Sequence, residues 1–168
     1  MKHLILLRHA KSSWKDSSLS DHDRPLNKRG KRTAPIMGKR LLNKSIQPQL
    51  IISSTAKRAL KTASIVANAI DYPTNRIEST RRLFHAWPDD ILQVASECNN
   101  SINVLMLVGH NPGTTDLANQ LLESHYFYNV PTAGLVTLEI NINNWKTITQ
   151  DTIKCKLIDY DYPKLSSG

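Results

Sequence analysis

Residues 4–14 read LILLRHAKSSW, an apolar run that ends directly in Arg8 and His9. The run does not alternate with polar residues, which is typical of a strand that is covered on both faces in a parallel sheet. In open α/β sheets, ligands bind in the crevice outside the carboxyl ends of the strands. We therefore expect Arg8 and His9 to lie at a ligand-binding edge of a sheet.

Two further predicted strands end in the same way. A strand over 49–54 leads into a helix whose first turn contains Arg58, and a strand over 104–108 ends in GHNP, which contains His110. If the three strands lie side by side and parallel, their carboxyl ends meet. Guanidinium groups and helix amino termini both bind phosphate oxygens. The convergence therefore predicts a phosphate site, and its residues are Arg8, His9, Arg58 and His110.

The helical segments follow the same alternating order. Asn27 is placed to cap a helix over 28–43, and apolar residues recur at helical spacing over 55–70. Another helix is expected to begin near Pro88, with Asp89 and Asp90 as helix-start residues rather than as catalytic acids.

The carboxyl-terminal third of the chain predicts a different kind of strand. Residues 134–142 and 154–161 alternate between apolar and polar more than the earlier runs do, so we expect an antiparallel or edge pair. Strands that alternate with helices predict an α/β sandwich with a largely parallel sheet. We expect a single domain over residues 1–168, because no linker or repeat interrupts the sequence.

The positive charge is concentrated near the predicted site. The chain has a net charge of +8, and residues 1–40 carry eleven Lys and Arg against three Asp, whereas the rest of the chain carries eleven of each sign. Such a patch attracts nucleic acid, an acidic protein or a phosphorylated small molecule, although a solvated helix face is the commoner outcome.

Several classes of protein are disfavoured. The apolar runs are too short to span a bilayer, and Arg8 and Lys11 interrupt the only run that resembles a signal peptide, so we expect a cytoplasmic protein. Cys98 and Cys155 lack the spacing of metal ligands and are expected to be packed thiols. We expect no metal, no other cofactor and no membrane partner, and a monomer is favoured.

Four segments resemble one family in order. They are LILLRHAKSSW (4–14), DHDRPLNKRG (21–30), ISSTAKRALKTA (52–63) and LMLVGHNPG (105–113). Together they resemble the histidine phosphatase superfamily, and within it the phosphohistidine phosphatase branch related to SixA. The resemblance implies the phosphoglycerate mutase-like fold, a three-layer α/β/α sandwich with a mostly parallel central sheet and an antiparallel edge. The chain has Ala10 where most of the superfamily has glycine, and alanine is small enough to keep a close backbone approach.

The resemblance also implies roles for the site residues. His9 would be the nucleophile that accepts the phosphoryl group, and Arg8, Arg58 and His110 would form the phosphate pocket. Many relatives carry a glutamate in a Leu-Tyr-Glu-Ala stretch, whereas RRLFHAWPDD (81–90) has His85 at that place. His85 is equally a candidate general acid and a residue that only lines the mouth of the pocket.

The chemistry follows from the residue types as well. A neutral imidazole can attack phosphorus in line, and arginines can stabilise the equatorial oxygens without a metal ion. Arg8 and Arg58 are expected to depress the pKa of His9, and a backbone carbonyl is expected to hold its other ring nitrogen.

Four functions compete. An imidazole leaving group needs less proton help than an alkoxide, so replacement of the glutamate by His85 favours a phosphatase that acts on phosphohistidine of a protein partner. A phosphomonoesterase for a small metabolite is the alternative enzyme, and a mutase is less favoured because the short chain has no evident lid. A non-catalytic module that binds anions or nucleic acid is the alternative of another class. The aromatic content of 6% and the lack of a nucleic-acid-binding motif count against nucleic acid.

Overall fold

A six-stranded mixed sheet forms the centre of the computed structural model, which describes residues 1–165. The strands are β1 (Lys2–Arg8), β2 (Leu50–Ser54), β3 (Glu78–Thr80), β4 (Val104–Gly109), β5 (Leu135–Ile140) and β6 (Cys155–Asp161). Their order is β3-β2-β4-β1-β5-β6. The first four strands in that order run parallel, whereas β5 is antiparallel to β1 and β6 is antiparallel to β5. The predicted parallel sheet with an antiparallel edge is confirmed.

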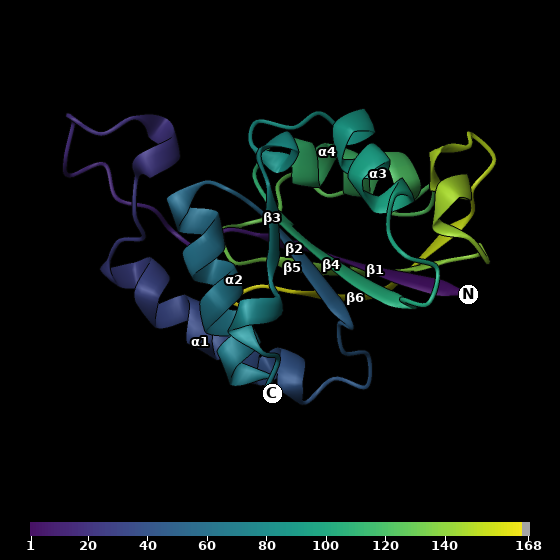
Figure 1. Ribbon diagram of the computed structural model, residues 1–168, viewed down its shortest axis with the longest axis horizontal. Coiled ribbons are helices and arrows are strands. Elements are labelled where there is room, and N and C mark those ends of the chain that lie inside the picture. Colours follow the sequence, from purple (N-terminus) through teal and green to yellow (C-terminus); the bar gives the residue numbers. More distant parts are fainter. Residues whose placement is uncertain (166–168) are drawn as a thin grey trace.

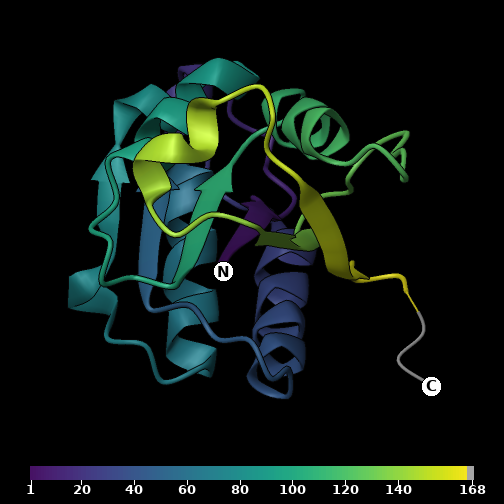
Figure 2. The same cartoon turned by 90° about the vertical axis from the view of Figure 1, so that its right-hand side faces the viewer.

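Helices cover both faces of the sheet. They are α1 (Lys28–Leu42), α2 (Lys57–Ala69), α3 (Pro88–Ser96) and α4 (Gly113–Leu121). Short 3₁₀ helices are η1 (Asp21–Asp23), η2 (Thr74–Arg76), η3 (Arg81–Leu83) and η4 (Trp145–Thr149). The two views place α1 and α2 on one side of the sheet and α3 and α4 on the other (Figure 1, Figure 2). The fold is therefore the three-layer α/β/α sandwich that the sequence predicts.

The unbroken apolar run of β1 is explained by these two layers. Ile5 and Leu7 pack into the core beneath α1 and α2, while Leu4 and Leu6 pack into the core on the α3 and α4 side. All four side chains are at most 2% exposed. A strand that separates two cores needs apolar residues at every position, so it lacks the alternation of a half-exposed strand.

The expected helix starts are also present. The Asn27 side chain accepts a hydrogen bond of 2.8 Å from the Gly30 amide and so caps α1. Gly30 is required there because a Cβ atom at this position would overlap the Lys11 carbonyl oxygen. The Asp90 carboxylate accepts from the Trp87 amide at 2.9 Å, which confirms a helix-start role for Asp90.

Two other sequence features can be placed in the structure. Cys98 and Cys155 are free, half-buried thiols, and burial raises the pKa of each to about 11. Among residues 1–165, no helix is long and apolar enough to cross a membrane.

Candidate active site

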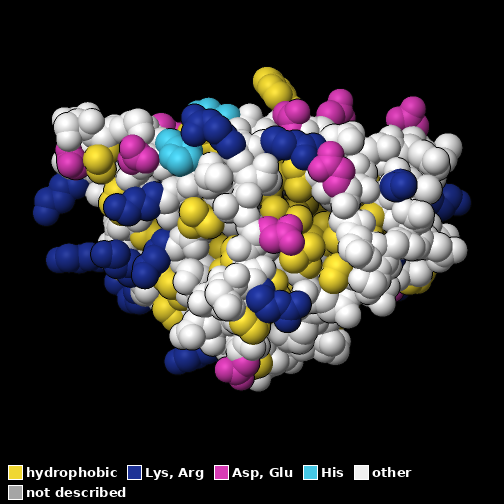
Figure 3. Space-filling view, in the orientation of Figure 1, with side chains coloured by type: hydrophobic (Ala, Val, Ile, Leu, Met, Phe, Trp, Pro, Cys, Tyr) yellow, Lys and Arg dark blue, Asp and Glu magenta, His cyan; other side chains and the backbone are white. Residues whose placement is uncertain are grey.

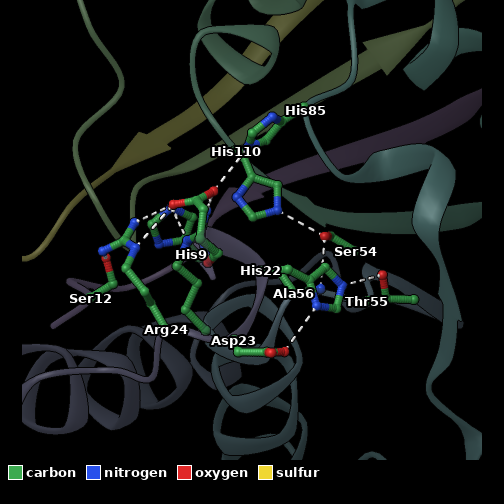
Figure 4. A network of polar contacts seen from close by, with 12 residues as sticks. His9, Ser12, His22, Asp23, Arg24, Ser54, Thr55, Ala56, His85 and His110 are labelled. Atoms are coloured by element: carbon green, nitrogen blue, oxygen red, sulfur yellow. Dashed lines mark hydrogen bonds and ion pairs between the residues drawn. The ribbon is translucent and has the colours of Figure 1, made fainter. Parts of the chain in front are cut away.

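The carboxyl ends of three neighbouring parallel strands form the candidate site. Arg8 ends β1 and His9 follows it, Arg58 lies in the first turn of α2 after β2, and His110 follows β4. The structure brings these side chains together. The rings of His9 and His110 are 5.0 Å apart between centroids (Figure 4), and Arg58 Nε lies 3.4 Å from His9 Nε2.

His9 is held as a neutral imidazole whose Nε2 lone pair accepts one long hydrogen bond, of 3.4 Å, from Arg58 Nε. Its ring is buried, and Nδ1–H donates a 2.7 Å hydrogen bond to the Ala10 carbonyl, as predicted. Since a carbonyl only accepts, Nδ1 carries the hydrogen and Nε2 keeps its lone pair. Burial, followed by the charges of Arg58 and Arg8, lowers the pKa of His9 to about 4, against the opposing effect of the Ala10 hydrogen bond. The prediction that the arginines cause this shift is therefore only partly right, because burial contributes more.

His110 presents a second ring nitrogen to the site. Its Nε2 lies 2.8 Å from Ser54 Oγ, and that hydroxyl already accepts the Ala56 amide, so its hydrogen is available to His110. This arrangement favours a hydrogen on Nδ1, which is buried and finds no partner among residues 1–165. Burial, followed by electrostatic repulsion from His9 and Arg58, lowers the pKa of His110 to about 3.

Arg8 carries another donor without a partner. Its Nη1 donates to the Val130 carbonyl at 2.9 Å, whereas its buried Nε has no hydrogen-bond partner within the described part of the chain. A buried donor without a partner costs free energy, and such groups are rare in folded proteins. Arg8 Nε and His110 Nδ1 are the two buried side-chain atoms of this kind in residues 1–165, and both belong to the predicted site. An anion bound there would satisfy them.

Asp21 was not singled out from the sequence, yet it connects much of the site. Its carboxylate accepts from Arg58 Nη2 at 3.0 Å and from Arg24 Nε at 3.0 Å, and its backbone carbonyl accepts from Arg58 Nη1. Desolvation opposes ionisation of Asp21, but hydrogen bonds from His85, Arg24 and Arg58 hold its pKa well below the usual range. Asp21 therefore fixes the guanidinium of Arg58 from two sides.

Arg24 is the second residue that the sequence reasoning missed. It is buried, donates to Ser12 Oγ at 2.8 Å, and its guanidinium lies 3.5 Å from the ring centroid of Trp14. A polar loop without periodicity gives no signal of burial. The signal that could have identified this residue is its position inside one of the four family-like segments.

His85 lies at the mouth of the site. Its side chain is 65% exposed, and Nε2 is 2.9 Å from Asp21 Oδ2. Its ring packs 4.0 Å from the Phe84 ring and lies 6.4 Å from the ring of His110. The backbone of His85 is left-handed, with φ of 54°, which places the residue on a tight turn between Phe84 and Ala86. A role of His85 as general acid stays a prediction.

The assembled groups suit a tetrahedral oxyanion. Arg58 Nε contacts His9 Nε2, the His110 ring is 5.0 Å from the His9 ring, and the charge of Arg8 is near enough to lower the pKa of His9. Such a group of cations and donors beside a neutral imidazole can stabilise a phosphoryl group during in-line attack. Among residues 1–165, no group of three or more His, Cys, Asp or Glu is placed to hold a metal ion.

Comparison with known proteins gives the family. The model of the histidine phosphatase superfamily (branch 1) matches residues 4–83. An uncharacterised chloroplastic protein of Arabidopsis thaliana is 33% identical over 153 residues, which cover 86% of this chain and 69% of its own length. The chain belongs to the histidine phosphatase superfamily. This family supports a hydrolase of the phosphatase class.

Solved structures agree with this assignment. The SixA protein of Agrobacterium tumefaciens, provisionally assigned as a phosphohistidine phosphatase, has a TM-score of 0.81 at 26% identity and covers 96% of this chain and 98% of its own. A protein histidine phosphatase SixA complexed with tungstate has a TM-score of 0.77 at 16% identity, with coverage of 96% and 97%. The predicted phosphoglycerate mutase-like fold is confirmed.

Proposed function

We propose that this superfamily member removes phosphate from phosphohistidine of a protein partner, through a phosphohistidine intermediate on His9. The observation that carries the proposal is the state of His9. Its Nδ1–H is fixed on the Ala10 carbonyl, and its Nε2 lone pair faces the site beside Arg58. With a pKa of about 4, the ring is neutral at pH 7 and available as a nucleophile.

In the first half-reaction, His9 Nε2 forms a bond to phosphorus while the P–N bond of the substrate breaks. The leaving imidazole departs neutral when its other nitrogen carries a proton. Because one P–N bond replaces another, the free energies of the reactants and products of this step are similar. Arg8 and Arg58 stabilise the charge on the equatorial oxygens, as preorganised donors do in phosphoryl transfer.

In the second half-reaction, water attacks the phosphorus and the P–N bond to His9 breaks. The water proton passes to phosphate or to solvent, and His9 returns to the tautomer that carries hydrogen on Nδ1. The scheme uses groups of this chain and water, so the proposed enzyme is independent of a metal or organic cofactor.

The residue at the glutamate position supports a P–N substrate over an alkyl ester. An alkoxide leaving group requires a proton donor, whereas a protonated phosphoimidazole does not. His85 occupies this position in place of a carboxylic acid. The site is therefore better matched to a leaving group that departs without help.

The surface around the site supports a macromolecular partner. Lys and Arg side chains gather at the left-hand end of the molecule, next to the histidines (Figure 3). The exposed cations that follow β1 and begin α1 are Lys11, Lys15, Lys28, Arg29, Lys31 and Arg32. A basic surface of this extent complements an acidic protein surface and accelerates its encounter with the site.

A phosphomonoesterase for a small metabolite is the second candidate. The observation in its favour is the pair formed by His85 and Asp21 at the mouth of the site, with Nε2 and Oδ2 at 2.9 Å. A histidine that is oriented by a carboxylate is a proton donor of the kind that an alkoxide would require.

The test compares phosphate release from a histidine-phosphorylated protein with release from a panel of sugar and glycerol phosphates. We expect turnover of the phosphoprotein and an acid-labile, base-stable label on the enzyme, both lost in His9→Ala. His3→Ala is the matched control because His3 lies at the amino end of the same strand. Full activity of His9→Ala would refute the mechanism, and turnover of the metabolites alone would establish the second candidate.

A further inference from the structure

A pocket of about 400 Å³ opens directly beside the phosphoryl site. Its lining residues come from two loops: His85, Ala86 and Trp87 from the segment before α3, and His110, Asn111 and Pro112 from the segment before α4. His110 belongs to both the pocket and the phosphoryl site, because its ring is 5.0 Å from that of His9. When the phosphoryl group of a substrate lies at His9, the rest of that substrate can therefore extend into this pocket.

The walls of this pocket are mostly apolar, and the polar side chains of His85, His110 and Asn111 complete them. The Trp87 side chain is 71% exposed, so the fold leaves most of a large aromatic surface uncovered, and Pro112 on the opposite loop is also exposed. The Trp87 backbone is fixed, because its amide donates to Asp90 and Pro88 follows it as the first residue of α3. An exposed indole on a rigid backbone is an anchor for a ring, since it loses little conformational entropy on binding.

The two loops are also fixed against each other. Gly113 begins α4, and a Cβ atom at this position would overlap the Ala86 carbonyl oxygen. This close approach joins the loop of Trp87 to the loop of Pro112. The pocket is therefore preformed, as is usual for small-ligand sites.

Charged groups occupy another part of the surroundings of His9. Asp21, Arg24 and Arg58 form a network of ion pairs with N to O distances of 3.0 Å, and Arg58 Nε reaches His9 Nε2. A ring placed against these groups would have to displace charged hydrogen bonds, whereas a ring on Trp87 covers a mostly apolar wall.

We propose that this pocket, formed by residues 85–87 and 110–112, is a leaving-group subsite for a flat aromatic or heteroaromatic ring that stacks on Trp87. The inference rests on the proposed function, under which the ring is the imidazole of the phosphorylated histidine. A single imidazole fills only part of the volume, so neighbouring atoms of the partner chain occupy the rest.

The test uses phosphonates, which cannot be hydrolysed and so report binding apart from turnover. Affinities for phenylphosphonate and methylphosphonate are measured by calorimetry in the wild type, Trp87→Ala and Trp87→Phe. We expect Trp87→Ala to lower the affinity for phenylphosphonate about three- to tenfold, and Trp87→Phe to retain most of the wild-type affinity. The affinity for methylphosphonate should be the same in all three proteins. Leu42→Ala, which removes an exposed apolar side chain at the far end of α1, is the control.

The outcomes separate the two proposals. Equal affinity of Trp87→Ala and wild type for phenylphosphonate would refute the subsite, even if the enzyme hydrolyses phosphohistidine. Equal losses for both phosphonates would also refute it, because they would show a general disturbance of the phosphoryl site. The third outcome is that phenylphosphonate binding depends on Trp87 as expected, but the wild type does not hydrolyse phosphohistidine. This outcome would support the pocket as a site for aryl groups and would refute the proposed function.

Discussion

The two buried histidines make a quantitative prediction about stability between pH 7 and pH 5. The folded-state pKa values are about 4 for His9 and about 3 for His110, against 6.5 for the free side chain. In this range the unfolded chain binds more protons than the folded chain, so the free energy of unfolding falls as the pH falls. Each histidine loses about 2 kcal/mol between pH 7 and pH 5, and the pair loses about 4 kcal/mol. That is a large share of the stability of an ordinary domain, which is about 5–15 kcal/mol.

The measurement is urea unfolding at pH 7, 6 and 5, followed by the fluorescence of the buried Trp145. His9→Gln and His110→Gln should each remove about half of the pH dependence, whatever they do to stability at pH 7. Exposed His125→Gln is the control. Asp21 acts in a separate, more acidic window. Its lowered pKa contributes stability near neutral pH, and this contribution is lost as the pH falls through the usual range of a carboxyl group and below it. An unfolding free energy that stays constant from pH 7 to pH 5 would refute the assignment of two neutral, buried imidazoles. An unchanged pH dependence in a variant that combines His9→Gln and His110→Gln would refute it as well.

Other perturbations test single contacts. Arg58→Ala should lower kcat for phosphate release about 100- to 1000-fold, or about 3–4 kcal/mol, because a preorganised donor is lost; a decrease below tenfold would contradict this role. Asp21→Asn should tighten tungstate binding in calorimetry because a negative charge leaves the site, and lower kcat because Arg58 loses a charged partner; weaker binding would contradict it. His85→Ala should slow the hydrolysis of alkyl phosphates more than that of aryl phosphates if His85 donates a proton to the leaving group. Equal losses of hydrolysis rate would show that His85 only shapes the mouth of the site. Gly30→Ala should lower the free energy of unfolding by about 1–3 kcal/mol in urea, because its methyl group would overlap the Lys11 carbonyl oxygen.

The fold could be predicted where a local pattern reports burial. The unbroken apolar run over 4–7 belongs to a strand between two cores, and the cap at Asn27 starts α1 as expected. By contrast, β3 has three residues, of which Glu78 and Ser79 are exposed, so it has neither the length nor the apolar content that a sequence pattern requires. Its assignment as a strand depends on pairing with β2, which is a tertiary interaction.

The site could be predicted where its residues directly follow strands. Arg8, His9 and His110 lie at or next to a strand end, and Arg58 lies in the first turn of the next helix. The condition that their three strands are parallel neighbours was therefore enough to place them together, and the order β2-β4-β1 meets it. Asp21 lies in a loop of polar residues, and its position is set by partners 37 and 64 residues away in the sequence. No local pattern encodes such contacts.

The hydrogen bonds of the site divide its donors into two groups, and this division explains how cations are kept in place for a substrate. The buried guanidiniums of Arg24 and Arg58 are paired with Asp21, which offsets the cost of burying positive charge and fixes their orientation. Arg8 Nε and His110 Nδ1 are left without a partner in the described chain. Because the paired donors hold the geometry and the unpaired ones are already in position, an arriving phosphoryl group finds its hydrogen bonds without reorganisation of the protein. Donors that need no reorganisation stabilise a transition state most effectively, so under the proposed function the carboxylate of Asp21 would contribute to catalysis by holding Arg58 rather than by touching the phosphorus.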